Sequence, residues 1–423
     1  MKTRRDFLRT VLLGASATWT VPIFVDRTFA QLHQQARDLA TQPVTGKDGT
    51  ILVVLQLAGG NDGLNTLVPH GNDTYHRLRP KLAKKSSEIL RLDDLLGLNA
   101  SMPFLHSLYQ NGNLGIVQGV GYPNPNRSHF VSTSIWETAD PATRTGTGWI
   151  GRYFDHACSG ADPTVGISLG KTQPEAFGAL RNPGIALTQP ELYRWLHSGG
   201  RKAQAEELFA KLNSPTQPGS AQSVSDPDSN LEFLQRVALD ARASSKTILE
   251  TAAKHRSTVH YDGSPIARSL NLVSRMIAGG LPTRVFYVSH GGFDTHNHQL
   301  GSHDRLLGQL DSALKSFFTD LRQQGNDQRV VVMTFSEFGR RVAENASAGT
   351  DHGKASCLFV AGPAIQGGLY GSPPDFSQLD DGDLRHTVDF RSVYATLLTQ
   401  WLHAPDSQAI LKGEFSGLPF LRA

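Results

Sequence analysis

The sequence predicts an α/β fold with a largely parallel central sheet flanked by helices. Short runs of β-branched and other apolar residues, bounded by glycines and turn residues, alternate with longer segments of helical periodicity. Because these runs are apolar throughout, both faces of the sheet are expected to be covered, which is typical of parallel strands. The predicted strands are residues 51–57, 114–118, 284–289, 329–335 and 357–361.

Four segments have the apolar spacing of helices, namely residues 231–253, 266–277, 303–323 and 390–402. The third shows the pattern most clearly, because Leu306, Leu310, Leu314, Phe317 and Leu321 fall on one helical face. In open sheets of this kind, ligands bind beyond the carboxyl ends of the strands. The search for chemistry therefore begins with the residues that follow each predicted strand.

Length and charge limit the classes of function. The chain has 423 residues, 39% of them hydrophobic, and a formal net charge of +3 with no run of five like charges. We therefore expect one composite domain over residues 31–423 and no nucleic-acid partner. The segment 213–230 is rich in Ser, Pro, Gln, Gly and Asp and is expected to be a surface loop. Whether Cys158 and Cys357 pair is left open.

The first 30 residues resemble a twin-arginine export signal. Arg4 and Arg5 precede a weakly apolar stretch at 11–25, and small residues at Thr28 and Ala30 fit cleavage after Ala30. The alternative is an N-terminal membrane anchor, although the stretch is shorter than the ~20 residues that span a bilayer. No later segment approaches that length. The expected location is periplasmic or secreted, with no stable membrane span after processing.

Polar motifs follow three of the predicted strands. A glycine-rich turn after the first contains Asp62, for which the alternative is a plain Asn-Asp turn. It lacks the spacing of a nucleotide-binding fingerprint. The third runs into residues 290–298, which hold three histidines and an aspartate. Asp294 and His298 stand four residues apart, so they can converge on one cation if the turn is helical.

The next strand, which ends at residue 335, runs into a segment that contains Glu337 and Arg340. Glu337 is a candidate metal ligand, and its alternative role is a salt bridge to Arg340 or its neighbour. His352 lies in a polar segment just before the chain re-enters the sheet, at the predicted strand 357–361. Taken alone, that histidine indicates little.

A further motif, residues 124–130, contains a Pro-Asn turn that leads into a predicted helix ending near Thr138. Ser128 is expected at its N-cap, where a serine oxygen accepts an otherwise unpaired backbone N–H. A hydroxyl at a helix N-terminus, beside Arg127 and a divalent cation, can also attack phosphorus or sulfur. Both roles for Ser128 stay open.

Taken in order, these segments resemble the alkaline phosphatase and sulfatase superfamily. They are more closely similar to an exported bacterial family defined as domain of unknown function 1501. The resemblance rests on residues 57–69, 127–136, 290–298, 334–341 and 351–371. It implies an alkaline phosphatase/sulfatase-like fold, and the family match bears on fold more than on substrate.

The resemblance also implies roles for single residues. Asp294, His298 and His352 would bind one ion. One carboxylate with two imidazoles is a ligand set of intermediate softness, which suits zinc or manganese. A second ion would lie among three other residues, Asp62, Glu337 and the nucleophile Ser128. Arg127 or Arg340 would neutralise charge on the transferred group.

Two departures from the superfamily pattern matter. Phe338 stands where a second histidine is expected, so the site at Asp62 lacks a recognisable fourth ligand. Either Asn65 or water supplies that ligand, or the site holds no ion. A centre with one ion therefore remains open. There is also no Cys-x-Pro-x-Arg segment, which disfavours formylglycine sulfatase chemistry.

The sequence therefore predicts an exported metal-dependent hydrolase of phosphate or sulfate esters that uses one or two divalent ions. Its nucleophile would be the Ser128 hydroxyl or a metal-bound hydroxide, and its substrate a small-molecule or polysaccharide ester. The competing hypothesis is a non-catalytic exported binding or assembly protein that retains the fold and one metal. Phe338 favours this second interpretation.

Overall fold

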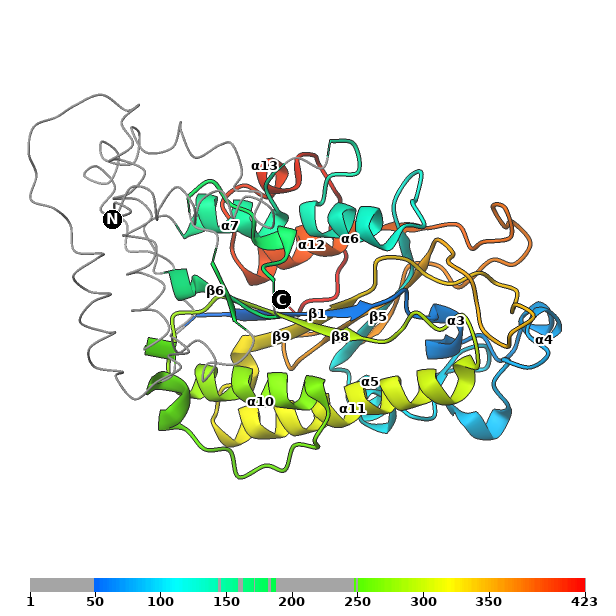
Figure 1. Ribbon diagram of the computed structural model, residues 1–423, viewed down its shortest axis with the longest axis horizontal. Coiled ribbons are helices and arrows are strands. Elements are labelled where there is room, and N and C mark those ends of the chain that lie inside the picture. Colours follow the sequence, from blue (N-terminus) through cyan, green and yellow to red (C-terminus); the bar gives the residue numbers. More distant parts are fainter. Residues whose placement is uncertain are drawn as a thin grey trace, which may run out of the picture. The chain divides into compact units, whose positions relative to one another are not determined.

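The computed structural model describes residues 49–143, 146–158, 163–170, 172–181, 184–187, 247–248 and 250–422. A large sheet runs through this part of the chain, with the strand order β11-β5-β10-β9-β1-β8-β6-β7 and with β12 beside β5 (Figure 1). β10 is antiparallel to both of its neighbours, and the other pairs are parallel. The fold is therefore α/β with a largely parallel central sheet, as the sequence predicts.

The five predicted strands are present with small shifts at their ends. They are β1 (Ile51–Ala58), β5 (Leu114–Gly121), β8 (Val285–Gly291), β9 (Val330–Phe335) and β10 (Ser356–Ala361). The sequence analysis did not predict β6 (Gly166–Leu169), β7 (Ile185–Leu187), β11 (Gly368–Tyr370) and β12 (Val388–Asp389). These strands have only two to four residues, too few for a clear pattern.

Helices cover both faces of the sheet (Figure 1). One face carries α5 (Pro103–Gln110), α10 (Pro265–Ala278) and α11 (Gln299–Gln323). The other carries α6 (His129–Thr138), α7 (Trp149–Ala157), α12 (Phe390–Thr396) and α13 (Ser407–Leu411). α12 continues as the π-helix η5 (Leu397–Trp401), so the predicted helix at 390–402 is confirmed as a helical segment of two types.

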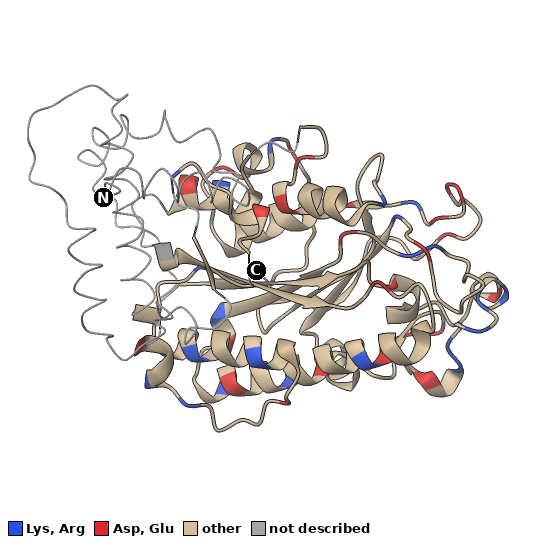
Figure 2. Ribbon diagram, viewed as in Figure 1, with Lys and Arg blue, Asp and Glu red and all other residues tan. Residues whose placement is uncertain are grey.

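The continuous apolar character of the strands follows from this layering. In β1, Val53 and Leu55 belong to the core under α10 and α11, whereas Leu52 and Val54 belong to the core under α6 and α12. Successive side chains of a strand point to opposite faces, so a strand covered on both faces needs apolar residues at every position. In Figure 2 the strands are almost entirely free of charged residues, which lie on the helices and loops.

A second, small antiparallel sheet lies near the start of the described chain. Its order is β2-β4-β3, formed by Leu67–Val68, Gly97–Asn99 and Ile89–Arg91. Two short helices, α3 (Gly63–Thr66) and α4 (Asp73–Leu78), lie in the same stretch. The remaining turns of 3-10 helix are η1 (Ser86–Glu88), η2 (Pro163–Val165), η3 (Glu175–Phe177) and η4 (Asp327–Arg329).

Three predictions fall wholly or mostly outside the described residues. These are the signal peptide at 1–30, the loop at 213–230 and most of the helix at 231–253, of which 247–248 and 250–253 are described and helical. No disulfide bond joins Cys158 and Cys357. Among the described helices, none combines the length and apolar composition needed to cross a bilayer.

The turn after β1 gives the first testable prediction. Gly59 has φ +120°, and a Cβ there would collide with the backbone of Phe293 and Asp294, whereas a Cβ at Gly291 would meet nothing within 4 Å. We expect Gly59→Ala to lower the free energy of unfolding by at least about 2 kcal/mol through backbone strain and overpacking. The matched control Gly291→Ala should change it by about 0.5 kcal/mol or less. Equal unfolding midpoints in denaturant would contradict this packing.

Candidate metal centre

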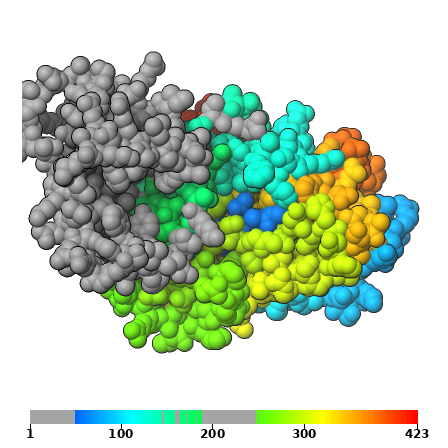
Figure 3. Space-filling view, viewed as in Figure 1, coloured from blue at the N-terminus to red at the C-terminus, as the bar shows by residue number. Residues whose placement is uncertain are grey.

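Polar segments from several strands meet at one edge of the sheet. β1, β8 and β9 run parallel, and β5 runs the same way because both it and β9 are antiparallel to β10. The carboxyl ends of these four strands therefore lie at the edge where β10 begins. In Figure 3, blue atoms of the first described segment are visible there between the cyan region of α6 and the yellow residues of the β8–α11 segment.

The buried Arg340 guanidinium holds three of these segments together. It donates to the carbonyl oxygens of Gly59 and Gly60 in the turn after β1, with Nε 2.6 Å from Gly60 O. It also donates to Phe293 O at 2.9 Å and Asp294 Oδ1 at 2.7 Å in the loop after β8. A further bond of 2.7 Å reaches Thr350 O, in the segment that leads to β10. The Arg340 guanidinium thus makes its contacts within the protein, and its role on a substrate group stays a prediction.

Three side chains converge at this edge. His129 comes from the first turn of α6, Asp294 from the loop after β8 and His352 from the segment before β10, and their ligand atoms all lie within 4.8 Å of one another. His352 Nε2 is 3.1 Å from Asp294 Oδ1, and His129 Nε2 is 3.5 Å from Asp294 Oδ2. The structure therefore brings together two of the predicted ligands, Asp294 and His352, with one that was not predicted.

His296 stands beside this group. Its Nε2 lies 2.9 Å from His352 Nε2 and 3.0 Å from Asp294 Oδ1. The sequence analysis noted the histidines of this loop without assigning His296 to the site. Four side chains with ligand atoms, three imidazoles and one carboxylate, thus meet at the sheet edge.

Each imidazole has an acceptor on its outer side. His129 Nδ1 lies 2.8 Å from Glu337 Oε1, His352 Nδ1 lies 2.9 Å from the carbonyl oxygen of Arg127, and His296 Nδ1 lies 3.1 Å from Asp351 Oδ1. Carbonyl and carboxylate oxygens accept, so the tautomer with the proton on Nδ1 satisfies these contacts and is the one that offers an Nε2 lone pair to a metal. Metal-binding histidines in proteins almost always have such an outer hydrogen bond.

The Nε2 atoms of the three histidines lie on the inner side of the cluster. Those of His296 and His352 are 2.9 Å apart, and among the described residues the buried His129 Nε2 has no hydrogen-bond partner. A tetrahedral zinc ion with bonds of about 2.05 Å separates its ligand atoms by about 3.3 Å. Four separations in the cluster, 2.9 to 3.5 Å, are close to that value, and the ligand atoms of His129, Asp294 and His352 all lie within 4.8 Å of one another.

The charge states also suit a cation. Burial opposes ionisation of Asp294, but hydrogen bonds from Arg340 and His352 outweigh it and lower the pKa of Asp294 to about 2. Burial lowers the pKa of His352 below the ordinary histidine value, despite the neighbouring Asp294. A carboxylate and a neutral imidazole are therefore present at neutral pH. The Asp294 side chain is 47% exposed, so one side of the cluster is open to solvent.

Asp62 lies in a different environment. Its Oδ2 accepts a 2.6 Å bond from Arg79 Nη1 and a second bond from Gln299, and its Oδ1 caps Leu64 N at 3.2 Å. Burial would raise the pKa of Asp62, but the Arg79 guanidinium keeps it below the ordinary aspartate value. The side chain is fully buried, and the structure does not bring it to the histidine cluster.

His298 and Glu337 also differ from their expected positions. The four-residue spacing from Asp294 requires a helical turn, but residues 294–297 form a loop, and α11 begins only after His298. His298 is therefore exposed and stays outside the cluster. Glu337 is buried behind His129, where its Oε1 also accepts from Gly59 N at 2.8 Å. It orients an imidazole rather than facing the open side.

Ser128 and Arg127 lie at the start of α6. Ser128 is exposed at the N-cap, and its hydroxyl makes no capping hydrogen bond. Arg127 is one-third exposed, and its guanidinium is ion-paired with Asp383 and, at 3.1 Å, with Asp381. The simple capping role of Ser128 thus has no support in its contacts.

The Phe338 ring fills the place beside the cluster where a further histidine was expected. Its centroid lies 4.9 Å from that of His129 and 4.6 Å from that of His352. It packs against two imidazoles and is itself buried. An apolar ring therefore borders this side of the cluster.

The chain belongs to the family of proteins of unknown function DUF1501, whose model matches residues 50–410. The sequence matches no curated protein. The resemblance to this family that its motifs indicate is therefore confirmed.

Similar solved structures include the PsFucS1 sulfatase from Pseudoalteromonas sp., at 12% identity and a TM-score of 0.39, with 94% of this chain and 74% of that chain covered. Another is a protein of the alkaline phosphatase superfamily from Vibrio parahaemolyticus, at 10% identity and a TM-score of 0.39, with coverage of 88% and 71%. A third is Ps i-CgsB in complex with k-i-k-neocarrahexaose, at 9% identity and a TM-score of 0.39, with coverage of 89% and 75%. At these TM-scores the likenesses carry no argument about activity or substrate.

Arg340 gives the second prediction. We expect Arg340→Met to lower the free energy of unfolding by at least about 3 kcal/mol, because it leaves buried carbonyl oxygens without a donor. The control is Arg341→Met, since the Arg341 side chain is 35% exposed and pairs with Asp381 and Asp383. That variant should lose about 1 kcal/mol or less. Chemical denaturation of the two proteins measures the difference, and similar losses would contradict the role of Arg340.

Proposed function

We propose that the protein is a metal-dependent hydrolase of phosphate or sulfate esters whose ion is held by His129, Asp294 and His352, with His296 beside them. The observation that carries the proposal is the convergence of Nε2 lone pairs and a carboxylate, each imidazole being fixed from behind by an acceptor. Zinc is the favoured ion, because two imidazoles and one carboxylate are a ligand set typical of catalytic zinc and leave the fourth tetrahedral position open. A divalent ion in this set supplies a Lewis acid for the ester.

The other residues of the site have separate tasks in this proposal. Arg340 keeps Asp294 ionised and in place, and Glu337 orients His129. Ser128 precedes His129 at the N-terminus of α6, where the helix dipole favours negative charge on an attacking oxygen. Arg127, although paired with Asp383, is part of the same segment and is proposed to meet the anionic group of the substrate.

The proposal contains one ion rather than two. The second predicted set consisted of Asp62, Ser128 and Glu337, but the Asp62 carboxylate is already bound to a guanidinium and Glu337 to an imidazole. A cation beside Asp62 would have to displace Arg79 from a fully buried salt bridge. The donor chemistry therefore favours a single centre.

We also propose that the protein is exported and acts outside the cytoplasm. The twin-arginine segment at 1–30 directs the mature chain, residues 31–423, to the periplasm or the medium, where it acts on a small-molecule or polysaccharide ester. The solvent-exposed side of Asp294 is consistent with a substrate that approaches from outside.

Metal content tests the ligand set. The purified protein should hold one zinc per chain by elemental analysis, and His129→Ala and His352→Ala should weaken zinc binding more than about a hundredfold, because each removes a direct ligand. His298→Ala is the matched control in the same region and should bind zinc normally. Asp62→Asn should also retain the ion although its fold is weakened. If zinc is lost from His298→Ala or Asp62→Asn and kept by His129→Ala and His352→Ala, the ligands are those that the sequence analysis predicted and not the ones proposed here.

Turnover tests the chemistry. With zinc, manganese, magnesium or calcium supplied in turn, we expect hydrolysis of at least one aryl phosphate, phosphodiester or aryl sulfate. Ser128→Ala should lower kcat by about a thousandfold or more if its hydroxyl attacks the ester. Ser134→Ala, on the same helix, should leave kcat unchanged. Metal-dependent turnover that survives Ser128→Ala would assign the attack to water.

The absence of turnover on every ester, at full metal occupancy, would contradict the hydrolase proposal. The alternative would then be a non-catalytic binding or assembly protein that retains one ion. In that case Ser128→Ala should leave partner affinity unchanged.

A further inference from the structure

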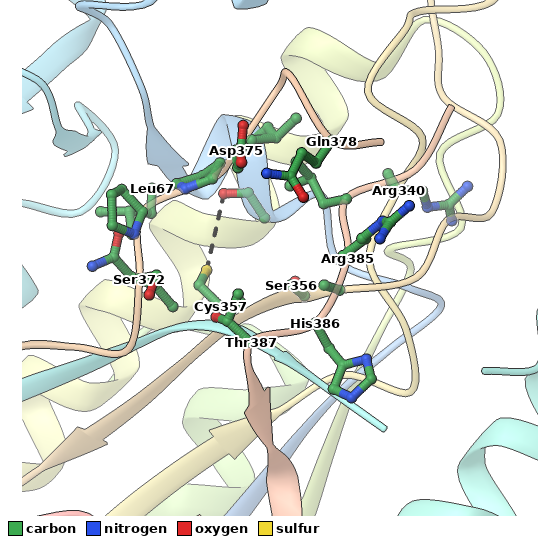
Figure 4. Close-up of a pocket in the computed structure, with 18 residues that line it drawn as sticks. Leu67, Arg340, Ser356, Cys357, Ser372, Asp375, Gln378, Arg385, His386 and Thr387 are labelled. Carbon is green, nitrogen blue, oxygen red and sulfur yellow. Dashed lines mark hydrogen bonds between the residues drawn. The ribbon is translucent and has the colours of Figure 1, made fainter. Parts of the chain in front are cut away.

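The organic part of an ester held at the metal centre needs a surface to bind. A cavity of about 200 Å³ lies near α3 and the start of β10, and neither the ligands of the metal cluster nor the residues of α6 line it (Figure 4). The part of a bound ester next to the ion is therefore expected to contact other residues at the sheet edge.

Phe130 is an exposed aromatic residue beside the metal centre. It follows the proposed ligand His129 and stands two positions after Ser128, in the first turn of α6. The residue is 90% exposed, and among the described aromatic residues it alone is mostly exposed. It belongs to none of the apolar clusters of the described chain. A phenyl ring in water gains free energy when another apolar surface covers it.

The position of Phe130 on α6 places it on the side of the helix that faces β8. Phe130, Ser134 and Glu137 share one helical face, because they are spaced by four and three residues. On that face, Glu137 Oε1 accepts from Tyr287 OH at 2.8 Å, and Tyr287 belongs to β8. Asp294 lies in the loop after β8. Phe130 is the N-terminal member of the face and therefore the one nearest to that loop.

Helix geometry also directs the ring toward the sheet edge. In an α-helix each Cα–Cβ bond tilts toward the N-terminus, so a side chain covers the turn before its own position. α6 begins at the edge that holds Asp294, because His129 Nε2 lies 3.5 Å from Asp294 Oδ2. In Figure 3 the cyan atoms of α6 border this edge. We infer that the Phe130 ring binds a ring in the alcohol part of the substrate ester, an inference that rests on the proposed function and narrows its substrate class.

A flat platform favours a rigid ring over a flexible chain. An aryl group or the C–H face of a sugar ring matches a phenyl ring in shape, and aromatic pairs add attraction beyond the area that they bury. A flexible alkyl chain loses rotational freedom when it is bound, whereas a ring is already rigid. The platform is uncharged, so it suits the alcohol part of the ester and leaves the anionic group to the ion and Arg127.

Turnover of matched esters tests the inference. The substrates are the phosphate or sulfate esters of benzyl alcohol, of the primary hydroxyl of glucose and of ethanol, supplied to the zinc-loaded protein. Phe130→Ala should raise KM for at least one ring ester about fivefold more than for the ethyl ester, because the contact acts on binding. Phe130→Tyr keeps the ring face and should restore KM. A larger effect on the benzyl ester assigns an aryl ring, and a larger effect on the glucose ester assigns a sugar.

Binding of stable analogues tests the same contact without turnover. Phenylphosphonate and methylphosphonate have the same anionic group and no ester bond, and they differ in the ring. Calorimetry should show that Phe130→Ala weakens phenylphosphonate about fivefold and methylphosphonate less. A preference for phenylphosphonate that depends on Phe130, in a protein that hydrolyses no ester, would support the ring site and contradict the hydrolase proposal.

Leu95→Ala is the matched control, because Leu95 is also apolar and 60% exposed but lies in the turn between β3 and β4. It should change none of these values. Phe130→Ala should keep its zinc and its melting temperature, since an exposed side chain contributes little to folding. Two results would overturn the inference. These are equal effects of Phe130→Ala on ring and acyclic ligands in both experiments, and a lower melting temperature of Phe130→Ala, which would show that the ring packs within the protein.

Discussion

The position of the site depends on the Arg340 guanidinium, which is buried between loops of three different strands. Its N–H groups are used by four carbonyl oxygens and the Asp294 carboxylate. A buried cation is tolerated only when it is paired and hydrogen-bonded, so these acceptors cannot move independently of it. Arg340 thereby fixes Asp294 at the edge of the sheet with one side of its carboxylate exposed to solvent.

The second constraint is the outer hydrogen bond of each imidazole. Glu337, Asp351 and the carbonyl oxygen of Arg127 come from different loops, yet each accepts from an Nδ1 and turns the Nε2 toward the same place. Such bonds fix the tautomer and the ring orientation together. This arrangement of imidazoles around a carboxylate is the basis on which we propose a metal ion at this edge of the sheet.

Much of the fold could be predicted from the sequence, because buried strands are apolar at every position and α11 has a regular apolar face. Asp294 was found because it follows a predicted strand in a cluster of histidines, and His352 was named only from the resemblance to the superfamily. His129 was missed, since its partner Glu337 lies 208 residues away and only the folded sheet brings them together. His298 was chosen on a spacing that assumes a helix, but the helix begins one residue later. The salt bridge between Arg79 and Asp62 could not be predicted, because nothing in the sequence around either residue indicates that they pair.

The central claim is that one ion lies between α6, the loop after β8 and the segment before β10. Anomalous X-ray diffraction at the zinc edge, on crystals of the zinc-loaded mature protein, tests it most directly. The account predicts one peak with His129 Nε2, His352 Nε2 and an oxygen of Asp294 about 2.0–2.2 Å away. A peak beside Asp62 or His298, or no peak in protein saturated with zinc, would contradict it.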